Sequence, residues 1–266
     1  MKNTKSYDVF GNIALVKFDG KTSAKAKRKF AEKIMKENTA IRTILEKTGK
    51  FKGRLRKQST RWIAGEKTKD VLYNENGCVF RFNIDKTYFS QRLSNERKDI
   101  ASLVKGNVFV MFAGVAPYSI VIARNKKVKK VYSNEISKDA NKYAELNIAL
   151  NKLKGKVAML NGDIKEITAK VKRGLTIGNE KIPRQFDYIV MPRPRLRESF
   201  LKQAFILSKK GTIIFYYGFG DEQNVKEEIF QEARKLKRKI SLFQIRKAGE
   251  IGVKKFRLMA RLKVLN

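Results

Sequence analysis

The chain has 266 residues, the length of about two domains. It carries 61 lysines and arginines against 25 aspartates and glutamates, so its formal net charge is +36, and 42% of its residues are hydrophobic. This composition excludes a chain that is disordered for want of apolar residues. The single cysteine, Cys78, excludes a disulfide scaffold, and the absence of histidine excludes histidine acid–base chemistry and histidine metal ligands. We expect no metal site.

The charge favours a polyanionic partner, and most polyanions in the cytoplasm are nucleic acids. The alternative is a lysine-rich surface of the thermophile kind, but such surfaces are also rich in glutamate and this chain is not. No apolar run reaches the ~18 residues of a membrane helix, and the first residues lack the apolar stretch of a signal peptide. A lone thiol suits a reducing compartment. We therefore expect a cytoplasmic protein, without a membrane segment, that binds nucleic acid.

Residues 1–90 are typical of a small α/β module. Their apolar patterns predict strands within Tyr7–Phe18 (broken at Gly11-Asn12), Ile41–Glu46, Val71–Tyr73 and Cys78–Ile84, and a helix over Ser23–Asn38. The segment Lys50–Arg61 carries six cations in twelve residues, and Arg124–Lys130 carries five in seven. Both are candidate phosphate contacts, and the alternative for each is a solvated basic loop.

Residues 91–266 alternate helices with apolar strands, which predicts a mostly parallel sheet covered by helices. The expected strands are Val108–Met111, Val131–Asn134, Val157–Leu160, Tyr188–Met191 and Thr212–Tyr217. The expected helices are Leu93–Val104, Tyr118–Arg124, Lys138–Leu150, Lys165–Val171, Glu198–Leu207 and Glu222–Leu236. The last two runs, Ile240–Arg246 and Lys254–Leu265, are joined so closely that their strands must be antiparallel. The expected fold class is α/β, with the plan of a Rossmann-like methyltransferase.

A cofactor loop is expected after the strand Val108–Met111. Gly114 lets the backbone approach a ligand there, but one glycine is not the pattern for a dinucleotide. Glu135 and Asp163 end the next two strands, where one carboxylate can accept from ribose hydroxyls and the other from an adenine amino group. Taken singly, each is better explained as a helix N-cap. Taken together after one glycine-containing loop, they favour binding of S-adenosylmethionine (SAM).

Four strings of residues are familiar from one family. CVFRFNIDKTYFSQRLSNER spans residues 78–97, MFAGVAPYSIVIA spans 111–123, and NEI and NGDI stand at 134–136 and 161–164. The chain resembles the archaeal tRNA (guanine-37-N1)-methyltransferase family, including its wyosine-pathway branch. The resemblance implies a SAM-dependent enzyme that methylates N1 of guanosine beside the anticodon. It also implies an RNA-binding module at residues 1–90 before a methyltransferase domain at 91–266.

The resemblance implies roles for individual residues. Glu96 matches the family's general base, and Arg56 matches an arginine that stabilises the charge developing on guanine O6. Without the family, we would interpret Glu96 as a first-turn helix charge and Arg56 as a solvated cation. The cofactor residues implied are Arg97, Phe112, Gly114, Glu135, Ile136, Asp163 and Ile164, and the substrate residues are Tyr88, Ser90, Pro192 and Arg193. The chemistry agrees, because N1 of guanine is protonated at neutral pH and a buried carboxylate can remove its proton.

Three positions depart from the family pattern. Val110 stands where an acid is usual, and Ala116 where a glycine is usual. Pro192 replaces an asparagine, which resembles the branch that also methylates C7 of 4-demethylwyosine. Many archaeal members also carry a further N-terminal domain that grips the outer corner of tRNA, and we expect it to be absent here.

Other interpretations remain. One is the sister enzyme of the wyosine pathway, which transfers the aminocarboxypropyl group of SAM, although the Glu96-Arg97 pair argues against it. Another is an RNA-binding protein with a degenerate cofactor site. We expect the partner to be the anticodon loop of tRNA, tRNA-Phe in particular, and the protein to be a monomer. Trp62, Phe89, Tyr216 and Tyr217 are expected to pack in the core, and the alternative for Trp62 and Phe89 is stacking on bases.

Overall fold

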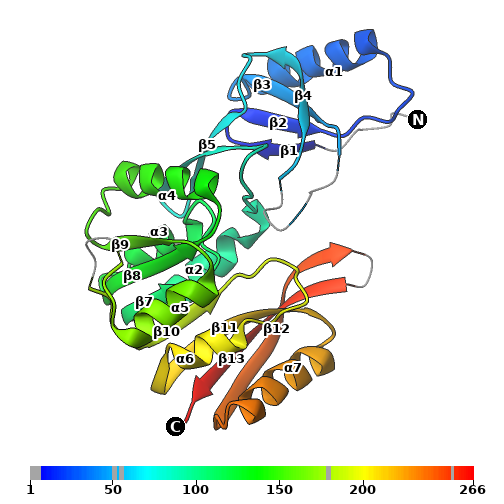
Figure 1. Ribbon diagram of the computed structural model, residues 1–266. Coiled ribbons are helices and arrows are strands. Elements are labelled where there is room, and N and C mark those ends of the chain that lie inside the picture. The colour runs from blue at the N-terminus through cyan, green and yellow to red at the C-terminus, as the bar shows by residue number, and fades with distance from the viewer. Residues whose placement is uncertain (1–6, 50–52, 54–56, 178–180, 253–254) are drawn as a thin grey trace. The chain divides into compact units, whose positions relative to one another are not determined.

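The structure is a computed structural model, shown in Figure 1. It describes residues 7–49, 53, 57–177, 181–252 and 255–266, with side chains described outside 250–255. The chain divides into two compact units, Met1–Gln91 and Arg92–Asn266. Among the helices of the described residues, none is long and apolar enough to cross a membrane.

The first unit contains a four-stranded sheet of order β1-β2-β3-β4, with bounds Tyr7–Phe10, Ile13–Val16, Thr43–Lys47 and Thr60–Gly65. Strands β2 and β3 are parallel, and helix α1 (Ala24–Glu37) connects them. Ser23 caps α1 by accepting from the Ala26 N–H, and Ala31 and Ile34 bury its apolar side in the core. The predicted helix and strands are thus present, whereas β4 was missed because it directly follows the basic segment.

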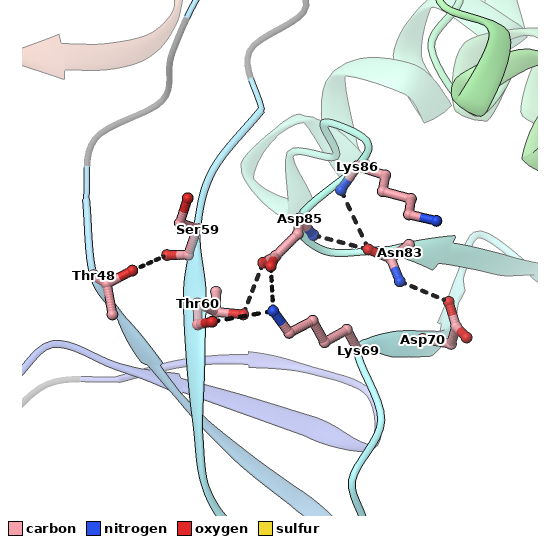
Figure 2. A network of polar contacts seen from close by, with 8 residues as sticks. All are labelled: Thr48, Ser59, Thr60, Lys69, Asp70, Asn83, Asp85 and Lys86. Carbon is pink, nitrogen blue, oxygen red and sulfur yellow. Dashed lines mark hydrogen bonds and ion pairs between the residues drawn. The ribbon is translucent and has the colours of Figure 1, made fainter.

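A separate hairpin, β5 (Asp70–Glu75) and β6 (Cys78–Asn83), completes the first unit. Figure 2 shows the polar network between this hairpin and β4. Lys69 Nζ donates to the Thr60 carbonyl (3.1 Å) and pairs with Asp85, which also accepts from Thr60 Oγ1 (2.7 Å). As predicted, Phe89 packs in the core, stacked on Phe82 with ring centroids 4.7 Å apart.

The second unit contains a seven-stranded sheet of order β12-β13-β11-β10-β7-β8-β9. The parallel strands are β7 (Gly106–Val110), β8 (Val128–Glu135), β9 (Val157–Asn161), β10 (Phe186–Met191) and β11 (Ser208–Gly220). Strand β13 (Lys255–Val264) is antiparallel to β11 and to β12 (Ile240–Gly252), as expected. The chain order reverses between β7 and β10, which is where open α/β sheets bind ligands at the carboxyl ends of their strands.

Helices cover this sheet, with α2 (Ser94–Leu103) packed on α3 (Pro117–Ala123). Helices α5 (Ile164–Arg173), α6 (Leu201–Ile206) and α7 (Glu222–Lys235) pack in series and share one hydrophobic core. Helix α4 has the predicted bounds, Lys138–Leu150. Helix α6 begins later than the predicted Glu198, so the segment from Pro192 to Ser199 is irregular. The α/β class with a mostly parallel sheet is confirmed.

Candidate active site

The loop between β7 and α3 lies at the carboxyl edge of the sheet and has an unusual backbone. Phe112, Gly114 and Ala116 all have positive φ, of 58°, 59° and 66°. Only glycine adopts this conformation without cost, so Ala116 keeps the backbone of the usual glycine against its own preference. Hydrogen bonds compensate: the Ala113 N–H donates to the Asn134 carbonyl (2.8 Å) and the Gly114 N–H to Glu135 Oε2 (2.8 Å). The loop is therefore fixed against the end of β8.

Glu135 is a nearly buried carboxylate that joins two loops. Besides the Gly114 N–H, it accepts from the Ser137 N–H at Oε1 (2.8 Å), while Ser137 itself caps α4. The N-cap explanation therefore does not hold for Glu135. A carboxylate is an acceptor of the kind to which ribose hydroxyls donate. Beside it, Ile136 is apolar and 37% exposed, which suits an adenine face.

Asp163 follows β9 and does cap a helix, accepting from the Lys165 N–H over 2.9 Å at the start of α5. Asn134 Nδ2 donates to the carbonyls of Leu160 (3.0 Å) and Gly162 (2.9 Å), which joins the ends of β8 and β9. Ile164 is 1% exposed and belongs to the core. The sheet thus gathers Phe112, Gly114, Glu135, Ile136 and Asp163 at one edge. Two acids, an apolar residue and a fixed glycine loop fit an adenosyl group.

Glu96, in the first turn of α2, is 6% exposed. Tyr217 Oη donates to its Oε1 over 2.8 Å, and Arg246 Nη2 lies 2.8 Å from its Oε2. Burial raises the pKa of Glu96 above the ordinary 4.5, while the hydrogen bond from Tyr217 and the charge of Arg246 oppose this shift. A carboxyl group whose pKa lies nearer neutrality is suited to general base chemistry. Arg97 is fully buried, with its guanidinium 5.7 Å from the centroid of the Tyr118 ring.

Arg193 is 3% exposed, and its guanidinium contacts the protein itself. Nε donates to the Tyr217 carbonyl (2.9 Å), Nη1 to the carbonyls of Leu196 (3.0 Å) and Glu198 (2.9 Å), and Nη2 pairs with Glu228 (3.3 Å). These contacts use nearly all of its donors, so they explain Arg193 as the anchor of its own loop. Substrate binding by Arg193 stays a prediction. Half-buried Pro192 begins this loop.

A cavity of about 420 Å³ adjoins the Arg193 loop. It is lined by the exposed Arg195 and Arg197 from the loop, by Phe219 and Gly220 from the end of β11, and by α7. Leu196, which lies between these two arginines, lines the same cavity.

Of the three substrate or catalytic residues predicted in the first unit, two lie among the described residues. Tyr88 and Ser90 are half-buried and follow β6, whereas Arg56 lies outside the described residues. Among the described residues on either side of Arg56, Thr48 donates to the Ser59 carbonyl from its N–H (3.1 Å) and its Oγ1 (2.9 Å). In the network of Figure 2, Thr60 then donates to Asp85, three residues before Tyr88.

Basic residues gather in a groove of about 990 Å³ between α1 and β4. Its cations are Lys25, Lys27, Arg28, Lys29 and Arg61, beside Trp62. Lys27 pairs with Glu46 over 2.6 Å, and Glu32 also lines the groove, so its five cations outnumber its two acids. Trp62, expected in the core, is only half-buried. The second basic segment, Arg124–Lys130, runs from the end of α3 into the first residues of β8, at the amino edge of its sheet. It is therefore at the opposite edge from the residues predicted to bind the cofactor.

Comparison with known families identifies the chain. The TRM5/TYW2 methyltransferase domain matches residues 71–245, and the TYW2 N-terminal domain matches residues 2–68. The chain belongs to the TRM5/TYW2 methyltransferase family. The family division thus falls between β4 and β5, while the structural division falls after Gln91.

Relatives support this assignment. The TRM5/TYW2 chain is 32% identical over 297 residues to a tRNA (guanine(37)-N(1))/4-demethylwyosine(37)-methyltransferase Taw22 of Nanoarchaeum equitans, covering 95% of this chain and 97% of that protein. It is 34% identical over 219 residues to a tRNA (guanine(37)-N(1))-methyltransferase Trm5b of Pyrococcus abyssi, covering 82% of this chain but 61% of that protein. A solved complex of aTrm5 and tRNALeu superposes with a TM-score of 0.81 at 25% identity, over 98% of this chain and 72% of that one.

Sequence reasoning missed the partners of Glu96 in this TRM5/TYW2 chain. Tyr216 and Tyr217 are fully buried in the sheet, as predicted, but both hydroxyls bond carboxylates: Tyr216 that of Glu228 and Tyr217 that of Glu96. Tyr217 lies 121 residues after Glu96, and Arg246 lies further on still. No local spacing could have signalled these contacts.

Proposed function

We propose that the chain is a SAM-dependent tRNA methyltransferase that methylates N1 of guanosine 37, beside the anticodon. The observation that carries this proposal is the buried Glu96, an acceptor whose pKa burial raises, in a member of a tRNA methyltransferase family. Relatives named for this reaction support it. We further propose that the enzyme acts in the cytoplasm as a monomer, with tRNA-Phe among its substrates.

SAM, when bound, supplies the methyl group on its sulfonium. Gly114, Glu135, Ile136 and Asp163 would hold it at the carboxyl edge of the sheet, with Glu135 accepting from the ribose. Arg97 would lie near the cofactor, as the family resemblance implies. Position 37 lies in a loop, so its base can leave the stack at little cost.

The reaction exchanges one bond for another at N1. As the N1–carbon bond forms, the carbon–sulfur bond of the sulfonium would break, and its electron pair would stay on the sulfur, which leaves as a neutral thioether. The N1 proton passes to Glu96, so the methylated guanine is neutral. Charge that develops on O6 would be stabilised by an arginine, for which Arg56 is the candidate. Tyr88, Ser90 and Arg193 are the further candidates for the base pocket.

A second methylation, at C7 of 4-demethylwyosine, is proposed for the same enzyme. Pro192 carries this proposal because it removes an amide side chain, with its hydrogen bonds, at the start of the Arg193 loop. The N. equitans relative, named for both methylations, supports it.

The test is a methyl-transfer assay with SAM on two tRNAs, followed by digestion and nucleoside mass. One is a tRNA-Phe transcript with guanosine 37, and the other the same tRNA with 4-demethylwyosine. A methyl on both supports the dual enzyme, and a methyl on guanosine alone removes the interpretation of Pro192. The larger mass of an aminocarboxypropyl group would show the sister reaction instead. Loss of both product and SAM binding would leave an RNA-binding protein with a degenerate site.

A further inference from the structure

Both oxygens of the Glu96 carboxylate are held, and from different strands. Tyr217 on β11 donates to Oε1, and Arg246 on β12 pairs with Oε2, each over 2.8 Å. The Glu96 side chain is 5% exposed, whereas that of Arg246 is 33% exposed. The carboxylate is therefore fixed on its buried side by a neutral donor and on its open side by a cation.

Tyr118 determines the direction of the Tyr217 hydrogen bond. Tyr118 Oη donates to Tyr217 Oη over 3.0 Å, and a hydroxyl has one proton, so the proton of Tyr217 points at Glu96. Burial raises the pKa of both tyrosines, which keeps both hydroxyls protonated. Tyr217 therefore acts as a donor, and a donor favours the ionised form of Glu96.

Asp99 competes for the cation. Arg246 Nη2 lies 3.2 Å from Asp99 Oδ2, on the same helix as Glu96. The charge of Asp99 raises the pKa of Glu96, in opposition to Arg246. The titratable or charged groups that act on Glu96 are Asp99 from α2, Tyr118 from α3, Tyr217 from β11, Arg246 from β12 and Arg257 from β13, while Arg97 from α2 acts on Tyr118.

We propose that Tyr217 and Arg246 are positioning residues that form a two-point clamp on the base, keeping it ionised and oriented, while Asp99 weakens the clamp by sharing Arg246. This inference rests on the function proposed above. A buried carboxyl group tends to bind a proton, and a protonated Glu96 could not accept one from guanine. Each oxygen has two acceptor positions, so the clamp leaves room for the N1–H.

The test is the pH profile of single-turnover methyl transfer to a transcript with guanosine 37. The acid limb is the part of the profile in which the rate falls as pH decreases and Glu96 becomes protonated. Arg246→Gln should move this limb to higher pH, because a positive charge next to the carboxylate is lost. The rate should fall roughly tenfold at the acid end and recover at alkaline pH. Tyr217→Phe should move the limb the same way and by at least as much, because the Tyr217 hydrogen bond is the largest of the causes that lower the pKa of Glu96. Asp99→Asn should move it to lower pH. Structural damage would instead lower the rate at every pH.

Two matched controls separate the clamp from general effects. Tyr216→Phe deletes a neighbouring hydroxyl that bonds Glu228 rather than Glu96, and Lys209→Gln removes a cation paired with Asp187 (2.7 Å) at the start of β11. Both should leave the acid limb in place. Arg246→Lys keeps the positive charge, so its acid limb should lie close to that of the unmodified protein. This variant keeps the test valid if Arg246→Gln folds poorly.

A second readout needs no substrate. Carbon NMR of carboxyl-labelled glutamate, with the Glu96 signal assigned by its absence in Glu96→Gln, follows the titration of Glu96 directly. The pKa of Glu96 should be raised in Arg246→Gln and in Tyr217→Phe and lowered in Asp99→Asn. Unmoved titrations in Arg246→Gln and Tyr217→Phe would overturn the clamp, whatever the activity. Absence of methyl transfer by the unmodified protein, with the titrations shifted as expected, would instead contradict the proposed function alone.

Discussion

Two clusters of glutamate, tyrosine and arginine lie at neighbouring residues of β11. Glu96 accepts from Tyr217 and pairs with Arg246, and Glu228 accepts from Tyr216 and pairs with Arg193. Their burial is reversed. Around Tyr217 the carboxylate is 5% exposed and the arginine 33%, whereas around Tyr216 the carboxylate is 30% exposed and the arginine 4%.

This difference in burial indicates which of the two clusters can transfer a proton. An arginine does not lose its proton in a protein, so burying Arg193 fixes a cation that can serve only as a hydrogen-bond donor. A glutamate can titrate, and burying Glu96 raises its pKa. The Glu96 cluster therefore suits catalysis, and the Arg193 cluster suits the anchoring of a loop.

The largest expected effect separates the two glutamates. Glu96→Gln should lower the single-turnover rate at N1 by about 10²–10⁴-fold, because it removes the proton acceptor. Glu228→Gln keeps the shape of its cluster and should change the rate far less. Equal losses in the two variants would break the distinction between the clusters.

The two arginines should differ in the free energy of unfolding, measured by urea denaturation. Arg193→Gln leaves buried carbonyls and Glu228 without their donor and should cost about 3–5 kcal/mol. Arg246→Gln removes a partly exposed cation from a buried carboxylate and should cost about 1–2 kcal/mol, the equivalent of roughly one pKa unit of Glu96. If Arg246→Gln were the more damaging, Arg246 would have a mainly structural role.

The loop that Arg193 anchors should contribute to tRNA affinity through its exposed arginines. The double variant Arg195→Gln/Arg197→Gln should weaken binding and reduce the slope of log affinity against log salt by roughly 2, because two phosphate contacts are lost. Lys126→Gln/Lys127→Gln, at the opposite edge of the sheet, is the matched control and should leave the slope nearly unchanged. An equal loss in the control would indicate only non-specific attraction.

The smallest effect is expected for the ion pair of Figure 2, which is more exposed than either β11 cluster. Asp85→Asn keeps an acceptor for Thr60 but removes the charge that pairs with Lys69, and should cost about 1 kcal/mol in thermal unfolding. Lys33→Gln, from the exposed pair Lys33–Glu37, is the control and should cost less. Equal small costs would show that the network adds nothing beyond surface charge.

Local signals explain what could be predicted from the sequence. Helix α4 has the predicted bounds because Ser137 caps it and its apolar spacing is regular. The carboxyl-edge loops were predictable because each follows an apolar strand. Strand β4 was missed since its six residues directly follow a cationic run.

Tertiary contacts explain what could not be predicted. The partners of Glu96 come from β11 and β12, far along the chain, and only the sheet order brings them to α2. The family resemblance implies that Arg193 binds substrate, and this role stays a prediction. Its burial and its carbonyl partners could not be predicted, because they depend on how the following loop folds back.

The most direct test of the central claim compares two tRNA-Phe transcripts that differ only at position 37, one with guanosine and one with adenosine. Each is incubated with the purified protein and SAM, digested, and analysed for methylated nucleosides. We predict 1-methylguanosine from the first transcript and no methylated nucleoside from the second. Equal methylation of both, or methylation at another atom or position, would contradict the assignment of the enzyme to N1 of guanosine 37.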